Sequence, residues 1–207
     1  MPDLEKVYLH RMIHIDNIPH ILQNGITHSS SANSNPSFKP IGDGSLITTR
    51  SSFVLKNGKR LGDYIPFYFS VRTPMLYVIQ KGFNLVNSTS AEKIVYCVVP
   101  VQRILDLKLD FVFTDGHAVD RFTTQYLKND IMDIESLIDW KAVRTKYWKD
   151  DNDLDLKRRK EAEFLVLGDI ATSAIRCYLV YNNAAKDRAV SLGVDPEKIY
   201  IKSNFYF

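Results

Sequence analysis

Short apolar segments recur along the chain with the two spacings that distinguish strands from helices. Residues 7–15 alternate between apolar and polar side chains, which is typical of a strand with one buried face. Residues 93–99 form an almost continuous β-branched run closed by Pro100, which predicts a buried strand. Further strand-like runs occupy residues 62–70, 110–114, 160–166, 174–181 and 198–207.

A helix is predicted directly after the first strand. Ile18 and Ile21 lie on one helical stripe of residues 17–24. Asp16 is placed to cap the first turn, and Gly25 is placed to end the last one. Similar patterns predict further helices at residues 101–107, 120–127, 130–140 and 184–192.

His14 stands at the junction between this strand and this helix. The free backbone amides of a helix N-terminus are a natural place to hold a phosphate or a ribose, so His14 is a candidate ligand-binding residue. A purely structural hydrogen bond from a single histidine remains the alternative.

Residues 28–44 are rich in Ser, Asn, Pro and Gly, which predicts a long loop. Loops of this length in a compact domain are usually functional or disordered. The loop leads into residues 41–50, whose glycines permit close backbone approach to a ligand and whose last residue, Arg50, can bind a phosphate or a carboxylate. Most aromatic residues of the 62–70 run must be core, and Tyr68 is the strongest candidate to line a flat pocket.

The composition of the chain narrows the class of protein and its expected location. The chain has 207 residues, of which 45% are apolar and 25% are charged, which predicts a single globular domain spanning residues 1–207. No apolar run approaches the roughly 20 residues of a membrane-spanning helix, so no membrane association is expected. The first residues lack a secretory signal pattern, which favours the cytoplasm. Cys97 and Cys177 lie in apolar runs as expected for buried thiols, and no Cys/His spacing predicts a metal site.

The net charge of +3 permits an anionic substrate without requiring one. A basic segment with interleaved aromatic residues follows residue 140, and its candidate nucleic-acid-binding residues are Arg144, Lys146, Tyr147 and Trp148. Cations there would meet phosphates while rings stack on unpaired bases. The alternative is a helix that buries Tyr147 and Trp148 and exposes the rest.

Glu161 and Glu163 lie two residues apart at the start of the 160–166 run. In a strand, alternate side chains share a face, so the two carboxylates would project together and could form a catalytic edge. The alternative is that both are solvated charges, which is the usual state of glutamate.

Four segments together resemble one known family, the DarT toxins, which ADP-ribosylate a base of single-stranded DNA. They are residues 14–18 with the helix to Gly25, residues 41–50, residues 63–69 followed by 74–77, and residues 162–166 (Ala-Glu-Phe-Leu-Val). The resemblance implies an α+β fold with an ADP-ribosyltransferase-like split, mainly antiparallel β core and surrounding helices. It also implies NAD as a substrate bound in the cleft between the halves, with no metal.

The resemblance further implies roles for individual residues. Glu163 matches the family's catalytic glutamate, and Arg50 matches the arginine near the reacting base and the NAD phosphates. The cofactor pocket would be formed by His14, Ile15, Asp16, Gly25, Arg50 and Tyr68, beneath a covering loop at residues 33–48. Residues 114–159 would present the DNA.

The chemistry fits these residue types. A carboxylate beside the ribose stabilises the positive charge that develops when the nicotinamide bond breaks. Arginine keeps its proton, so Arg50 is expected to orient phosphate and base. The target base must be unpaired, because its attacking edge is hidden in a duplex. The resemblance is closer to the thymidine-modifying branch than to the guanosine-modifying one, and it implies a macrodomain antitoxin (DarG-like) as partner.

Two other functions stay open at this stage. The sequence Glu161-Ala162-Glu163 also matches the pattern of arginine-specific protein ADP-ribosyltransferases, in which Glu161 would orient a guanidinium. A non-enzymatic nucleic-acid-binding domain would use the basic aromatic segment alone. In the DNA-modifying interpretation, Glu161 is a solvated charge or one that supports Glu163 indirectly.

Overall fold

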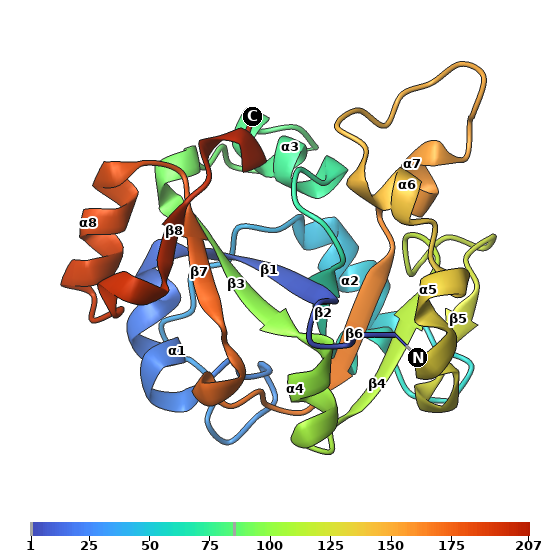
Figure 1. The fold of residues 1–207 in the computed structure, drawn as a ribbon, viewed down its shortest axis with the longest axis horizontal. Helices are drawn as coiled ribbons and strands as arrows, with labels where there is room; N and C mark the ends of the chain where they lie inside the picture. The colour runs from blue at the N-terminus through green and yellow to red at the C-terminus, as the bar shows by residue number, and fades with distance from the viewer. Residues whose placement is uncertain (1, 85) are drawn as a thin grey trace.

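In the computed structural model, which describes residues 2–84 and 86–207, eight strands form one sheet in the order β5-β4-β6-β2-β1-β3-β7-β8 (Figure 1). The strands are β1 (Tyr8–His14), β2 (Tyr64–Tyr68), β3 (Ile94–Pro100), β4 (Asp110–Thr114), β5 (Gln125–Tyr126), β6 (Glu163–Leu167), β7 (Cys177–Val180) and β8 (Ile199–Ile201). Neighbouring strands are antiparallel except for β7 and β8, which are parallel.

The helices surround this sheet. They are α1 (Ile18–Asn24), α2 (Gly44–Ser52), α3 (Pro74–Lys81), α4 (Val101–Asp106), α5 (Ile134–Leu137), α6 (Trp140–Arg144), α7 (Leu156–Lys160) and α8 (Asn183–Ser191). Short 3-10 helices are η1 (Ile15–Asn17), η2 (Leu61–Asp63), η3 (Ala91–Lys93), η4 (Lys128–Asp133), η5 (Thr172–Ala174), η6 (Pro196–Lys198) and η7 (Ser203–Phe205). Within the described ranges, no helix is long and apolar enough to cross a membrane.

The sheet splits between β1 and β2. These strands share one paired position, His10 with Tyr68, whereas β1 and β3 are paired along the whole length of β1. The two halves of the sheet, β3-β7-β8 with β1 and β4-β5-β6 with β2, lie on opposite sides of the view in Figure 1. The predicted split, mainly antiparallel α+β core is therefore confirmed.

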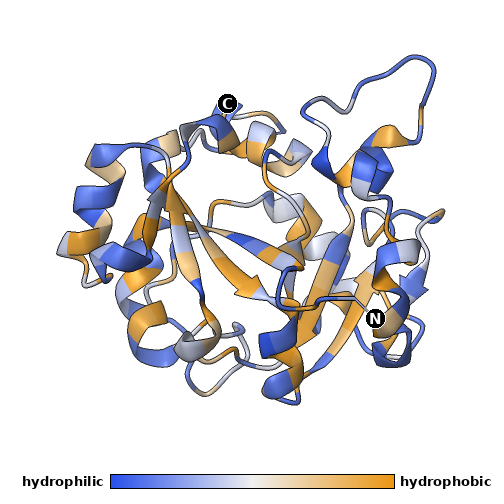
Figure 2. Cartoon of the chain, viewed as in Figure 1, coloured by the Kyte–Doolittle hydropathy of each residue, from blue (hydrophilic) through white to orange (hydrophobic). Residues whose placement is uncertain are grey.

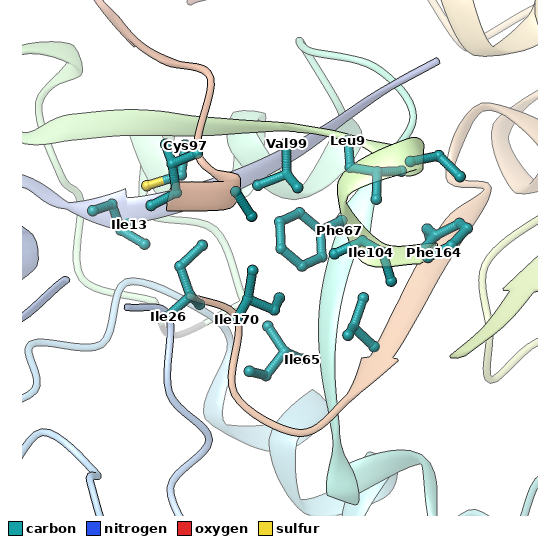
Figure 3. Close-up of a cluster of buried hydrophobic side chains, with 14 of the residues drawn as sticks. Leu9, Ile13, Ile26, Ile65, Phe67, Cys97, Val99, Ile104, Phe164 and Ile170 are labelled. Carbon is teal, nitrogen blue, oxygen red and sulfur yellow. The ribbon is translucent and has the colours of Figure 1, made fainter. Parts of the chain in front are cut away.

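The main core holds the two halves together. Leu9 and Ile13 of β1 pack with Ile65 and Phe67 of β2 and with Phe164 of β6, and all are almost fully buried (Figure 3). Apolar residues are concentrated on the central strands, and α8 is mainly hydrophilic (Figure 2). Because both halves contribute to one apolar layer, the cleft between β1 and β2 has a fixed width.

A second apolar cluster lies where α3 packs against β3 and β7. Leu76 and Ile79 of α3 contact Tyr96 and Leu179 there. The buried Tyr206 belongs to the same cluster, and its hydroxyl lies 3.1 and 3.0 Å from the carbonyl oxygens of Ile94 and Leu179. The C-terminal residues thus close this side of the sheet.

Several local predictions were wrong. Residues 120–127 form turns and β5, because Tyr126 pairs with Phe113 of β4 and stacks on its ring. The last predicted strand ends at Ile201 and continues as η7. The first turn after β1 is capped by His14 and not by Asp16, since the Asp16 N–H donates to His14 Nδ1 (3.2 Å).

Two helices were not predicted. Asp43 caps α2 by accepting the Ser45 N–H (2.8 Å), so residues 44–52, expected to be partly loop, are helical. Helix α3 carries ordinary signals that were overlooked: Thr73 as N-cap, Pro74 in the first turn and Gly82 in the left-handed conformation at the end.

Candidate active site

Glu163 begins β6 in the middle of one half of the sheet. It is paired with Tyr68 of β2, and its backbone N–H donates to Thr114 Oγ1 of β4 (3.1 Å). Its side chain is only 1% exposed. Strands on both sides therefore fix the position of this carboxylate.

Both oxygens of the Glu163 carboxylate accept hydrogen bonds. Arg50 Nη1 lies 2.8 Å from Oε2, and the Ala118 N–H donates to Oε1 over 2.9 Å. Arg50 comes from the last turn of α2, 113 positions away in the chain, and its side chain is 15% exposed. Such charge-assisted bonds hold the carboxylate in one orientation.

The Arg50 guanidinium has spare donor capacity. Its Nη2 atom is buried and has no hydrogen-bond partner among the described residues. A buried donor without a partner costs free energy, which an anionic ligand would recover. Arg50 thus holds Glu163 with one nitrogen and leaves the other for a phosphate.

Two adjoining cavities occupy the cleft between β1 and β2. Their volumes are about 200 Å³ and 550 Å³, and both are lined by Arg11, Phe38, Pro40, Ile47, Arg50 and Pro66. The smaller cavity also contacts Tyr68 and His117, and the larger one contacts Thr27 and His28. The cleft is thus continuous and runs beneath residues 38–47.

The loop over this cleft is tied to the end of β1. Asn17 Nδ2 donates to the Lys39 carbonyl oxygen and the Lys39 N–H donates to Asn17 Oδ1, each over 2.9 Å. The Lys39 ammonium lies 2.6 Å from an Asp16 carboxylate oxygen, and Arg188 of α8 lies 3.3 Å from the other. These cations hold the pKa of Asp16 below its ordinary value.

The structure brings together three of the predicted site residues: Glu163, Arg50 and Tyr68. Burial raises the pKa of Tyr68, which lines the smaller cavity of the cleft. The other predicted cofactor residues do not line the cavities of the cleft, and their role stays a prediction. Ile15 packs its side chain in the main core, and His14 uses Nδ1 on the backbone.

Gly25 has a clear structural role. Its φ is +81°, and a Cβ atom there would lie 2.2 Å from the carbonyl oxygen of Ile170. The neighbouring Ile26 pairs with Ile170 through two backbone hydrogen bonds of 2.9 Å. Gly25 therefore permits the close approach of α1 to the segment after β6.

Sequence reasoning missed Arg11 and His10 in the cleft. Arg11 Nη1 donates to the Pro66 carbonyl oxygen (2.9 Å) and so bridges the split strands, and burial lowers its pKa to about 10. His10 is kept neutral, because burial lowers its pKa to about 4. The available signal was Arg11 itself, a charge among the apolar positions Leu9 and Ile13 of the alternating strand.

A third cavity of about 700 Å³ adjoins the smaller cavity of the cleft. Asp43, Leu46, Met75 and His117 line both this cavity and the smaller cavity of the cleft. Glu161 also lines the third cavity and is only 9% exposed, so the expectation that it is solvated was wrong. Burial raises its pKa to about 7.

The basic aromatic segment is only partly free to bind. Arg144 and Lys146 are exposed, and Tyr147 is 67% exposed. The half-buried Trp148 contacts the rings of Tyr77 and Phe207 at 5.8 and 5.6 Å. The alternative of a helix burying both aromatic residues was wrong, because α6 ends at Arg144.

Among the described residues, no group of three or more His, Cys, Asp or Glu side chains could hold a metal ion. The polar side chains lining the smaller cavity are His10, Arg11, Asp43, Arg50, Tyr68 and His117, and Arg50 connects this lining to the buried carboxylate of Glu163. Such an arrangement can bind a dinucleotide and stabilise positive charge on a ribose.

Comparison with known proteins agrees with this geometry. The family model described as "ssDNA thymidine ADP-ribosyltransferase, DarT" matches residues 10–207. A DNA ADP-ribosyl transferase of Thermus sp. (strain 2.9) is 30% identical over 98% of this chain and 97% of its own length. A fusion of a DNA ADP-ribosyl transferase with a DNA ADP-ribosyl glycohydrolase from Thermosipho africanus is 31% identical over 76% of this chain and 38% of the fusion.

Solved structures of the Thermus sp. 2.9 DarT share the fold. Its complex with ADP-ribosylated single-stranded DNA has a TM-score of 0.84 at 27% identity, covering 98% of this chain and 97% of that one. Its complex with NAD+ has a TM-score of 0.80 at 27% identity, covering 100% of this chain and 99% of that one.

Proposed function

Because the chain belongs to the DarT family of DNA ADP-ribosyltransferases, we propose that it transfers ADP-ribose from NAD+ to thymidine in single-stranded DNA and releases nicotinamide. It is an NAD-dependent DNA ADP-ribosyltransferase. The observation that carries the residue assignment is the buried pair of Glu163 and Arg50, whose arginine lines both cavities of the cleft.

Glu163 stabilises the transition state. Its carboxylate is fixed by Arg50 and by the Ala118 amide, and carboxylate oxygens retain lone pairs that can accept a ribose hydroxyl. As the bond to nicotinamide lengthens, the ribose gains positive charge beside this preorganised negative group. Removing such a fixed electrostatic partner typically costs about 10²–10³-fold in rate.

Arg50 orients the substrates. Its paired nitrogen holds Glu163, and its free Nη2 atom faces a ligand phosphate. The cleft beneath residues 38–47 takes NAD+, and Tyr68 lines its inner end. We retain His14, Ile15, Asp16 and Gly25 as predicted contributors, with Asp16 acting through the loop that it ties down.

The DNA strand approaches from the third cavity. Lys157 at that cavity has no ion pair among the described residues and can meet a phosphate, although carboxylates also line the cavity. Phe122 there is exposed and can stack on a base. We propose Arg144, Lys146 and Tyr147 as further contacts along the strand, supported by their exposure. Trp148 contributes through its packing.

We also propose a domain organisation, a location and a partner for the enzyme. Residues 1–207 form one domain, supported by the single sheet to which segments from Tyr8 to Ile201 contribute. The enzyme acts in the cytoplasm, where single-stranded DNA and NAD+ meet. It is a toxin whose partner is a macrodomain antitoxin that removes the modification, supported by the fused transferase and glycohydrolase of Thermosipho africanus.

Incubation with labelled NAD+ and oligonucleotides tests the activity. Label should appear on a thymidine-containing single strand and be absent from the matched duplex and from a strand without thymidine. Glu163→Gln should abolish labelling, whereas Glu197→Gln, at an exposed glutamate beside the distant edge strand β8, should not. Label on protein alone would refute the DNA assignment and favour the protein-modifying alternative.

A further inference from the structure

We propose that Glu161 is the base that accepts the proton from the attacking ring nitrogen of thymine, an inference that rests on the proposed function. In a thymidine nucleotide N1 carries the sugar, so N3 is the ring nitrogen available to attack, and it carries a hydrogen. The reaction therefore needs a proton acceptor, and Arg50 is unsuited because guanidinium keeps its proton.

The end of α7 places Glu161 apart from Glu163. Glu161 follows the last residue of α7 and is not in β6, so the two side chains do not share a strand face as the sequence predicted. Glu163 lies fully within the sheet, whereas Glu161 lines the third cavity. The two carboxylates therefore lie in different surroundings, one inside the sheet and one at the wall of the cavity.

The Glu161 carboxyl group has no hydrogen bond and no ion pair among the described residues, although its side chain is largely buried. Both oxygens of Glu163, by contrast, have partners. Its two oxygens are not among the fully buried polar atoms of the described residues that lack a partner, so they are accessible from the cavity and free to accept a hydrogen bond. Here it faces a cavity of about 700 Å³, from which a ligand with an N–H group can supply the missing hydrogen bond.

This cavity meets the NAD cleft at four shared lining residues, one of which is His117. In this proposal a base enters from the cavity, meets the ribose near these shared residues, and has Glu161 on its own side of the junction. The anomeric carbon comes from the cleft, and the attacking nitrogen comes from the side of Glu161.

Burial moves the pKa of Glu161 towards neutral pH, and its charged neighbours act in opposite directions. Burial is the main cause that raises the pKa of Glu161 to about 7; Glu163 and Asp120 raise it further, and Lys157 and Lys160 lower it. Most other charged groups lining the cavity have partners: Arg158 binds Asp155 (2.7 Å), Asp43 accepts from Ser45 (2.8 Å) and Asp120 accepts the Phe122 N–H (2.9 Å). Lys157 has no ion pair among the described residues, and it is the largest influence that lowers the pKa of Glu161.

His117 is the rival base at this position, but burial lowers its pKa. A base whose pKa lies near the working pH combines availability with proton affinity. Glu161 meets this condition better than His117, whose proton affinity is reduced by burial, and better than an ordinary exposed glutamate.

The step balances without a further reactant. The bond between the ribose C1 carbon and the nicotinamide nitrogen breaks, and its electron pair leaves with nicotinamide. A new bond forms from thymine N3 to that carbon, the N3 proton passes to a Glu161 oxygen, and the proton then goes to solvent.

Single-turnover transfer to a thymidine strand, measured across pH 5.5 to 9, tests the proposal. The wild-type rate should rise about tenfold per pH unit at low pH and become level above about pH 7. Glu161→Gln should lower the rate at pH 7.5 by about 10²–10⁴-fold. The rate of the Glu161→Gln variant should keep rising up to pH 9, because without a protein base the transfer depends on ionisation of the thymine N3–H group itself.

Three further measurements separate a base from a structural residue. Glu161→Gln should leave the Kd for NAD+ and the KM for DNA near wild type, since the amide fills the same volume. Glu161→Asp should restore part of the rate together with the levelling above neutral pH. The surface control Glu197→Gln should match the wild type throughout.

Either of two results would overturn the inference while leaving the proposed function intact. One is a Glu161→Gln enzyme with the wild-type rate and pH profile; the other is a Glu161→Gln enzyme that has lost NAD+ affinity in proportion to its rate. A wild-type enzyme that labels no DNA at any pH would instead refute the proposed function and this inference with it.

Discussion

The pairing of Arg50 with Glu163 makes a quantitative prediction about stability. Removing one charge from a buried ion pair costs about 3–5 kcal/mol, because the remaining charge stays buried without compensation. Glu163→Gln should lower the free energy of unfolding by about 3 kcal/mol, the lower end of that range. Arg50 is 15% exposed, and the glutamine side chain can still accept its hydrogen bond. Arg50→Gln should cost a similar amount, because it leaves the fully buried carboxylate with only the Ala118 amide.

The double variant should be more stable than the sum of the single losses. Replacing both charges removes the uncompensated partner, so a double-mutant cycle from urea unfolding should give a coupling energy of about 2 kcal/mol. Circular dichroism at neutral pH measures all four proteins. Additive losses within about 0.5 kcal/mol would show that the two side chains do not interact in solution, and the account of the site would fail.

Three smaller predictions follow from other contacts. Gly25→Ala should lower the free energy of unfolding by more than about 1 kcal/mol, whereas Gly58→Ala, also at positive φ but in open space, should cost less in thermal melts. Tyr147→Ala should weaken single-strand binding by about 1–3 kcal/mol in fluorescence anisotropy without changing stability, whereas the packed Trp148→Ala should destabilise the fold. The folded state lowers the pKa of Asp16, so the ionised carboxylate stabilises the loop above the unfolded pKa of about 4, and this stabilisation is lost as the pH falls below it. Hydrogen exchange of residues 28–43 should therefore accelerate only in acid.

The elements that could be predicted are those with a local pattern. The alternation in β1, the continuous apolar run of β3 and the stripe of α1 all depend on neighbours in sequence, and the structure contains each of them. Glu163 and Arg50 were found through local motifs as well. Their contact joins positions 113 apart, and no periodicity contains that information.

The parts that could not be predicted depend on tertiary pairing. Residues 120–127 have helical spacing, but β4 offers them an open edge, and the gain from pairing Tyr126 with Phe113 outweighs a weak propensity. Arg11 interrupts an apolar face for a reason that appears only when β2 is placed beside β1, because the acceptor of its hydrogen bond is the Pro66 carbonyl oxygen.

The pair of glutamates shows how a small local difference divides chemical roles. A spacing of two would place both carboxylates on one face of a strand, but Glu161 is the C-cap of α7 and β6 begins only at Glu163. Glu163 is therefore held by donors on two sides, a fixed arrangement suited to stabilising positive charge. Glu161 has no such donors, and burial brings its pKa to the range in which a carboxylate can take a proton at neutral pH. One change of backbone conformation thus separates the carboxylate that we propose to stabilise the ribose from the carboxylate that we propose as the base.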